Sequence, residues 1–249
     1  MDTATHEHIS TLNNKKVLRV LLAGVGGSGS RMLVQLTALH KGLRAQGGAG
    51  LHVEVADPKR VSVASLVRQN FLESEVGLYK AHALTTRINR ALGLHWEGHA
   101  QNAESLASED FDLIISALDS GQARRSFGEA FGLLGPEPSR HCAYHVDLGN
   151  ERDFGQWLLG GSSLPLPYFE HPALLKGGDV GPSCSALESL LKQDLFINDA
   201  LALFTAHTLW GLLLEGKTRT RGGFVNLGNF ALSGLPIPAA ELELRHAAD

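Results

Sequence analysis

Apolar positions along the first 150 residues follow two spacings in alternation. Nearly continuous apolar runs are typical of strands buried on both faces of a sheet, and they predict strands at 16–23 and 111–118. Alternating apolar and polar residues predict a strand at 51–56, and further strands are expected at 141–148 and, shorter, at 95–100. Between these runs apolar residues recur at helical spacing, which predicts helices from 27 to the glycine-rich stretch 42–50, over 76–94 and over 122–134. We therefore expect an α/β fold, a Rossmann-like and mostly parallel sheet with helices on both faces.

The pattern changes after Asn150. A run at 155–160 predicts an antiparallel strand, and residues 162–182, rich in Gly, Pro and Ser, predict a crossover loop. Helical spacing resumes over 185–215, in one piece or two, and short strands are expected at 223–227 and 230–232. This part of the chain should add a C-terminal antiparallel extension to the sheet.

The chain has the length of one large α/β domain. Residues 1–15 contain two acids and no apolar stretch of signal-peptide length, so we expect a disordered tail and not a secretory leader. Residues 16–249 should form a single domain, in which 16–150 is the nucleotide-binding half and 151–249 is an elaborated second half. The apolar window 195–214 contains polar residues whose burial in lipid would be costly, which favours a core or interface helix and no membrane association.

Composition excludes several classes of partner. The net charge of −4 offers no electrostatic reason to bind nucleic acid or an anionic membrane. The only cysteines, Cys142 and Cys184, are too few for a disulfide framework and lack the paired spacing of a structural zinc site. We therefore expect a reducing, cytoplasmic location and no structural zinc.

The first strand ends in the loop Gly24-Val25-Gly26-Gly27-Ser28-Gly29, which fits the dinucleotide fingerprint. Glycines there let the backbone approach a phosphate, and the helix that follows supplies unpaired N–H donors at its N-terminus. A glycine turn also simply lets a strand and a helix pack closely. Because this loop follows a buried strand and opens an amphipathic helix, we predict that it binds a nucleotide.

Two acids should share the sheet edge at which this loop lies. Asp57 follows the second strand, 28 residues after Gly29, and the glycine-rich insert explains that long separation. Its carboxylate could accept hydrogen bonds from ribose hydroxyls, and that of Asp119, after a later strand, could hold Mg²⁺. Each could equally be a turn residue or a helix cap. Arg68 and Lys80 are candidate phosphate ligands, although singly each resembles a surface charge.

Two motifs turn this general pattern toward one family. The stretch D-P-K-R-V-S-V-A-S-L-V-R-Q-N-F from Asp57, followed by V-G-L-Y-K-A at 76–81, resembles the E1/ThiF/MoeB family, the ATP-dependent activators of ubiquitin-like and sulfur-carrier proteins. In the second half, H-V-D-L-G-N, G-P-S-C-S and K-Q-D-L-F-I-N are similar to the ThiF-like protein of the PRTRC system.

The resemblance implies a set of site residues and a reaction. Asp57 would bind the ribose, Asp119 would bind Mg²⁺, and the remaining ATP-site residues would be Gly24, Gly26, Gly27, Gly29, Ser65, Arg68, Gln69, Lys80 and Leu118. A carrier protein's C-terminal carboxylate would attack the α-phosphate of ATP, giving an acyl-adenylate and pyrophosphate. The resemblance also implies a homodimer, a small ubiquitin-like β-grasp carrier bound by residues 151–249, and an E2-like protein as a further partner.

The sequence departs from that family at several positions. The family's usual asparagines are Ser65 and Ser120 here, and an acid expected two residues after Asp57 is Lys59. No arginine precedes Arg19, whereas many members carry an earlier arginine that reaches the neighbouring protomer's site, and the paired CxxC motifs are missing. This departure leaves open a catalytically weak or inactive binding module.

Cys184 and the bound cofactor each allow two interpretations. A thiol at an expected helix start has a lowered pKa, so Cys184 could accept the acyl group as a thioester, or it could be a small buried residue. Cys142 lies in an apolar strand and is expected to be buried. An NAD-dependent oxidoreductase would share the glycine loop and the ribose acid, but it would leave Arg68, Gln69 and Lys80 without a role.

Overall fold

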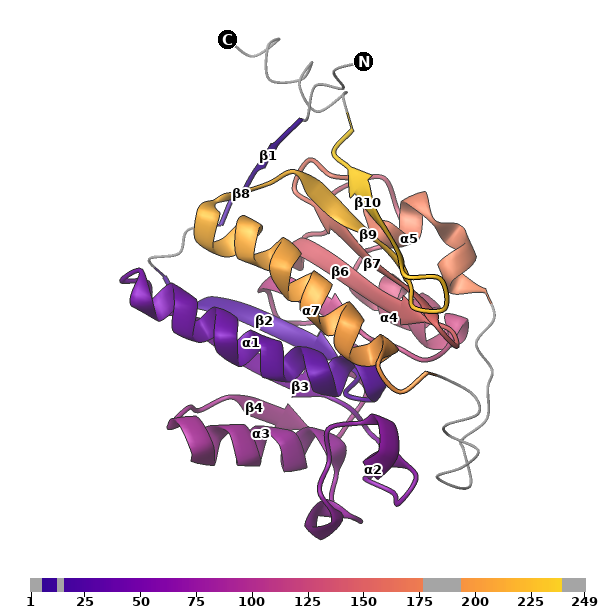
Figure 1. Cartoon of the computed structure of the whole chain (residues 1–249). Helices are drawn as coiled ribbons and strands as arrows, with labels where there is room; N and C mark the ends of the chain where they lie inside the picture. Colours follow the sequence, from indigo (N-terminus) through magenta and orange to yellow (C-terminus); the bar gives the residue numbers. More distant parts are fainter. Residues whose placement is uncertain (1–5, 13–15, 177–193, 239–249) are drawn as a thin grey trace.

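The computed structural model describes residues 6–12, 16–176 and 194–238. Its centre is an eight-stranded sheet with the order β10-β9-β7-β6-β5-β2-β3-β4 (Figure 1). Five neighbouring strands are parallel: β4 (Glu97–His99), β3 (Leu51–Ala56), β2 (Leu18–Ala23), β5 (Phe111–Ser116) and β6 (Cys142–Asn150). The expected Rossmann-like α/β sheet is confirmed.

The remaining three strands extend the sheet beyond β6. They run antiparallel to their neighbours and comprise β7 (Phe154–Gly161), β9 (Thr220–Asn226) and β10 (Ala231–Pro236). This arrangement confirms the C-terminal antiparallel extension.

Helices cover both faces because successive residues of the central strands point to opposite sides. Val20 and Leu22 of β2 pack with α1 (Gly27–Ala45), α3 (Lys80–Leu92) and α7 (Ile197–Trp210). Leu21 and Ala23 pack with α4 (Gly121–Ala130), α5 (Pro167–Glu170) and the 3₁₀ helix η2 (Ala103–Leu106). In Figure 1, α1 and α7 lie side by side on the face of the sheet to which Val20 and Leu22 point.

Helix α1 continues past its predicted end at Gly42 and stops at Ala45. A Cβ atom at Gly42 would lie 2.6 Å from Leu214 Cδ2 and 3.3 Å from the Trp210 ring. The glycine therefore permits close packing against the α7 segment and does not end the helix. Beyond Trp210 the chain continues as the π-helical turn η4 (Gly211–Glu215).

Helix α3 begins at Lys80, four residues later than the pattern predicted. The short helix α2 (Ser65–Arg68) and the 3₁₀ turn η1 (Glu73–Glu75) precede it, and Gly77 has a φ of +89°. A left-handed residue cannot continue a right-handed helix, so the turn at Gly77 delays the start.

The segment at the N-terminus corrects the expectation of a tail disordered over 1–15. Strand β1 (His8–Ile9) pairs with β8 (Lys217–Thr218). His8 is fully buried, and its Nε2 lies 2.7 Å from the Tyr144 hydroxyl. Residues 6–12 are therefore part of the fold.

Two further expectations concern the chain between β7 and β9. The predicted crossover loop contains α5 and the 3₁₀ turn η3 (Pro172–Leu175) in the part that the structure describes, which ends at residue 176. The part of the predicted helix at 185–193 lies outside the described residues. The segment Ile197–Glu215 is long and apolar enough to cross a membrane, but 56% of its most apolar window is buried, with Leu201 and Leu209 in the core.

Candidate functional site

Three central strands end level with one another at the site. Ala23, the last residue of β2, pairs with Ala56 of β3 and with Ser116 of β5. The glycine loop, Asp57 and the Leu118–Asp119 segment follow these strands directly, so all three emerge at the carboxyl edge, where open α/β sheets bind ligands. The sequence predicted this juxtaposition.

The glycines of the loop serve different purposes. Gly24 has a φ of +84°, and a Cβ there would lie 2.7 Å from the Ala117 carbonyl oxygen. A Cβ at Gly27 would lie 2.5 Å from Asn198 Oδ1, and one at Gly29 would overlap the Gly24 carbonyl. At Gly26 a Cβ would meet no described atom within 4 Å. The neighbouring backbone therefore requires glycine at Gly24 and Gly29, Gly27 lets Asn198 approach closely, and Gly26 borders open space.

The first turn of α1 faces that space. Gly26 is the N-cap, no side chain caps it, and the first turn contains no acid. The leading N–H groups of a helix have no partner within the helix, and they carry a positive partial charge. This terminus can hold an anion such as a phosphate.

Asp57 fastens the loop to the sheet. Its buried carboxylate accepts the Val25 N–H through Oδ2 and the Lys59 N–H through Oδ1, each at 2.8 Å. Each carboxylate oxygen has lone pairs for a further bond. The geometry thus gives Asp57 the expected role of a turn residue and leaves its oxygens able to accept ribose hydroxyls.

Lys80 is the most unusual charge at this edge. It is the first residue of α3 and is 6% exposed, and its Nζ lies 5.9 Å from the centre of the Phe71 ring. Burial lowers the pKa of Lys80, with a contribution from Lys59, while the charges of Asp57 and Asp119 oppose the shift. An ammonium group whose desolvation is only partly compensated is stabilised when a phosphate approaches.

The α2 segment brings three further predicted residues beside the loop. The Asn70 N–H donates to Ser30 Oγ in the first turn of α1, at 3.0 Å. Gln69 Oε1 is buried and accepts no hydrogen bond from described residues, and burial lowers the pKa of Arg68. Ser65 is buried, and its Oγ accepts the Ser62 N–H at 3.2 Å, so it closes a local turn.

Asp119 was expected to hold Mg²⁺. Its side chain is 74% exposed and forms an ion pair with Lys59. Partial desolvation by neighbouring groups opposes the shift, but the hydrogen bond and charge of Lys59 lower the pKa of Asp119 overall. A divalent ion at Asp119 would have to displace the Lys59 ammonium and then lie beside it. The residues present do not fit an independent Mg²⁺ site.

Leu118 and the two cysteines complete the predicted set. Leu118 Cδ2 lies 3.5 Å from the position of a Cβ at Gly24, so this side chain lines the loop. Cys142 is buried, as expected, and burial raises the pKa of its thiol to about 12. Cys184 lies outside the described residues.

The sequence did not single out the role of Asn198, at the start of α7. This side chain is buried, and its Oδ1 accepts the Ser28 hydroxyl at 2.9 Å and Asn150 Nδ2 at 3.4 Å. It therefore connects the glycine loop to β6 and α7. The only signal was that Asn150 and Asn198 end two of the motifs that carried the narrower resemblance.

A buried polar network behind the same edge was also missed. Asp147 Oδ1 accepts hydrogen bonds from Ser116 Oγ at 2.9 Å, Tyr168 Oη at 2.9 Å and Arg124 Nε at 3.2 Å. Ser116 Oγ also lies 2.8 Å from His145 Nε2. Because Ser116, His145 and Asp147 are all fully buried, this is not a nucleophilic triad open to substrate. The network holds the end of β5 and the start of α4 in place.

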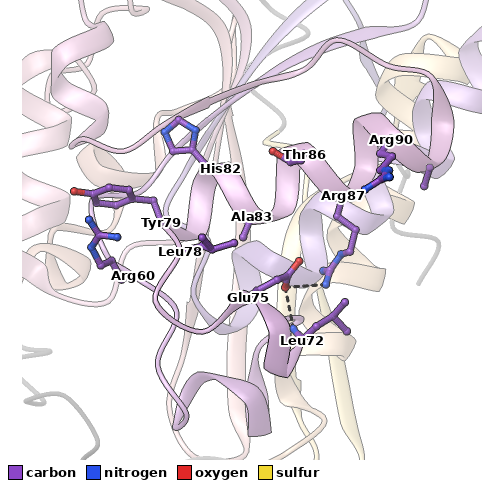
Figure 2. A pocket seen from close by; sticks show the side chains of 11 residues that line it. Arg60, Leu72, Glu75, Leu78, Tyr79, His82, Ala83, Thr86, Arg87 and Arg90 are labelled. Carbon is purple, nitrogen blue, oxygen red and sulfur yellow. Dashed lines mark hydrogen bonds and ion pairs between the residues drawn. The ribbon is translucent and has the colours of Figure 1, made fainter.

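A separate cavity of about 650 Å³ opens on the outer side of α3 (Figure 2). The Arg60 guanidinium carbon lies 3.8 Å from the centre of the Tyr79 ring there, and Arg87 Nη1 forms an ion pair with Glu75 Oε2 at 3.0 Å. Leu72 and Leu78 are among its apolar lining residues. No predicted site residue lines it.

Comparisons with solved structures place the fold. The chain is similar to selenomethionine PaaA, with 14% identity and a TM-score of 0.57, over 88% of this chain and 64% of that one. It is similar to E. coli MccB determined with ATP, with 14% identity and a TM-score of 0.58; the match covers 90% of this chain and 65% of MccB. The microcin C7 biosynthetic enzyme MccB in complex with N-formylated MccA gives 13% identity and a TM-score of 0.57; the match covers 88% of this chain and 64% of that one.

The chain thus spans slightly less than two thirds of the length of these structural relatives. At such low identity they show the fold alone. Comparison with curated proteins finds no match. The model of the ThiF family matches residues 6–131, half of the chain, and includes the glycine loop, Asp57, Lys80 and Asp119. The protein belongs to the ThiF family.

Proposed function

We propose that this protein uses ATP to adenylate the C-terminal carboxylate of a small protein or peptide. The observation that carries the proposal is the buried Lys80 ammonium at the same sheet edge as the uncapped glycine loop and Asp57. A glycine loop alone suits any nucleotide. A desolvated cation beside it favours a nucleotide with a long phosphate chain.

The reaction needs positioning and charge stabilisation more than acid–base chemistry, because a carboxylate is already a nucleophile. A carboxylate oxygen forms a bond to the α-phosphorus, the bond from that phosphorus to the bridging oxygen breaks, and pyrophosphate leaves with the electron pair. The α1 N-terminus and Lys80 would stabilise the negative charge on the phosphates. Asp57 would hold the ribose hydroxyls, and Arg68 and Gln69 would contact the phosphates from α2.

The class of substrate rests on family membership and on two structural relatives. MccB has been determined with ATP and in complex with MccA. We extend the proposal to a ubiquitin-like β-grasp carrier, a homodimer, an E2-like partner and the PRTRC branch of the family, each supported by the family motifs in the sequence. A cytoplasmic location and thioester formation at Cys184 are further predictions. A nicotinamide-dependent oxidoreductase would leave the buried Lys80 unexplained.

The test is ATP–pyrophosphate exchange with a panel of small β-grasp proteins ending in glycine and of peptides with free C-termini. We expect exchange to require one of these substrates and to fall about a hundredfold in Lys80→Met, the effect of removing one group that stabilises transition-state charge. Lys41→Met, the same change at an exposed site in the C-terminal half of α1, is the control and should exchange normally.

Two outcomes would refute the proposal. ATP binding without exchange across the whole panel would favour a non-catalytic binding module. Binding of NAD without binding of ATP would favour an oxidoreductase. Circular dichroism of Lys80→Met would establish that lost exchange does not reflect a lost fold.

A further inference from the structure

The charges at the sheet edge differ from the family pattern at Lys59. Replacing the family's acid with lysine changes the charge at this position from −1 to +1. The gain of two positive charges equals the charge that a Mg²⁺ ion would bring. The structure also shows which residues the Lys59 side chain and backbone contact.

Three contacts fix Lys59 between the ribose acid and α3. Its N–H donates to Asp57 Oδ1 at 2.8 Å, and its carbonyl accepts the Lys80 N–H at 3.0 Å. Its Nζ forms an ion pair with Asp119 across the edge. The backbone of Lys59 is thus held by the same residue that holds the glycine loop, and its side chain spans from the end of β3 to the end of β5.

The Lys59 ammonium is close enough to Lys80 to affect it. The charge of Lys59 contributes to the lowered pKa of Lys80, whereas Asp119 opposes that shift. Two ammonium groups therefore interact with the Asp119 carboxylate, Lys59 by direct contact and Lys80 through its charge. Both partners of the Lys59–Asp119 pair are largely exposed, so the pair itself contributes little to stability. Because an ammonium has three donors, Lys59 can keep its contact with Asp119 and still bind a phosphate oxygen.

We propose that the Lys59 ammonium binds the nucleotide's phosphates in place of a divalent cation held by Asp119. Asp119 is then a positioning residue that aims Lys59 across the site, and it is not a metal ligand. This inference rests on the proposed function, since it assumes that ATP binds at the glycine loop. Its consequence is nucleotide binding with little dependence on Mg²⁺.

The experiment measures ATP binding by titration calorimetry, in buffer with MgCl₂ and in buffer with EDTA, for the full chain. We expect the wild-type dissociation constant to differ by less than about threefold between the two buffers. Lys59→Ala should weaken binding about tenfold in EDTA, the effect of losing one charged hydrogen bond, and less in MgCl₂. Lys59→Asp, which restores the family's acid, should bind only in MgCl₂. Lys41→Ala is the matched control and should follow wild type in both buffers.

Asp119→Asn separates the two roles of that residue. A positioning residue predicts a modest weakening that is equal in both buffers, because the amide still hydrogen-bonds to Lys59. A metal ligand predicts a loss confined to MgCl₂. The inference is overturned if wild type binds ATP only with Mg²⁺, or if Lys59→Ala binds as tightly as wild type in EDTA. Wild type that binds no ATP in either buffer would instead refute the proposed function.

Discussion

The glycine loop allows packing and ligand binding to be separated by two single substitutions. Gly29→Ala and Gly26→Ala each add one methyl group at the start of α1. At Gly29 the new Cβ would lie 2.9 Å from the Gly24 carbonyl carbon and closer still to its oxygen. At Gly26 it would meet no described atom within 4 Å.

The expected stabilities follow from those surroundings. Backbone cannot move aside as a flexible side chain can, so Gly29→Ala should cost about 1–3 kcal/mol of overpacking, reduced by up to about 1 kcal/mol because alanine favours a helix. In a chain of this size the melting temperature falls by about 2–4 °C for each kcal/mol. Gly26→Ala should cost about 1 kcal/mol, because alanine is a poorer N-cap than glycine, and it should add no overpacking.

ATP affinity should respond mainly to the substitution at Gly26, whereas stability responds mainly to the one at Gly29. The Gly26 methyl would occupy the space that the α1 N-terminus faces, so ATP affinity should fall at least about tenfold while the fold stays intact. Urea unfolding followed by circular dichroism measures the first effect, and calorimetric titration with ATP measures the second. If Gly26→Ala binds ATP as wild type does, the loop is a packing device and the assignment of the nucleotide to it is wrong. Equal destabilisation by both variants would refute the packing argument.

Two further predictions concern buried groups. Burial lowers the pKa of His145 to about 4, so in its folded state this group resists protonation, and stability present above pH 6.5 should be lost as the pH falls toward 4. The loss is at most about 3 kcal/mol, and His145→Gln should flatten the dependence of the unfolding free energy on pH over that range. Because the pKa of the Cys142 thiol is raised to about 12 by burial, alkylation of the native protein followed by peptide mapping should leave Cys142 unmodified until denaturant is added. Labelling of Cys142 in the native state would contradict the packing of β6.

Local patterns carried most of what the sequence predicted correctly. Strand β3 occupies 51–56 as expected, because apolar Leu51, Val53 and Val55 alternate with polar side chains, and this alternation is the period of a strand. The glycine loop was found because a turn with a φ of +84° at Gly24 restricts the residue type at that position itself. Signals of this kind depend only on neighbouring residues.

Features that depend on distant residues were not predicted. Gly42 lies inside α1 because Leu214 packs against it, and nothing near Gly42 in the sequence indicates that contact. The ordered segment at His8 depends on the Tyr144 hydroxyl, 136 residues away. The role of Asn198 depends on Ser28 in the same way. Sequence periodicity describes the environment of a residue but does not identify its partner.

Three of the departures from the family motifs are single substitutions, and they differ in kind. Ser120 Oγ accepts the Ala123 N–H at 3.1 Å and caps α4, a role that asparagine performs equally well. Ser65 similarly satisfies the local turn at Ser62. Both substitutions exchange one short polar side chain for another. Lys59 alone reverses a charge, and it does so where its ammonium reaches Asp119 and affects Lys80. Of the three, only Lys59 changes what the site can do chemically, and for this reason the dependence of nucleotide binding on Mg²⁺ is the property in which this protein should differ from its family.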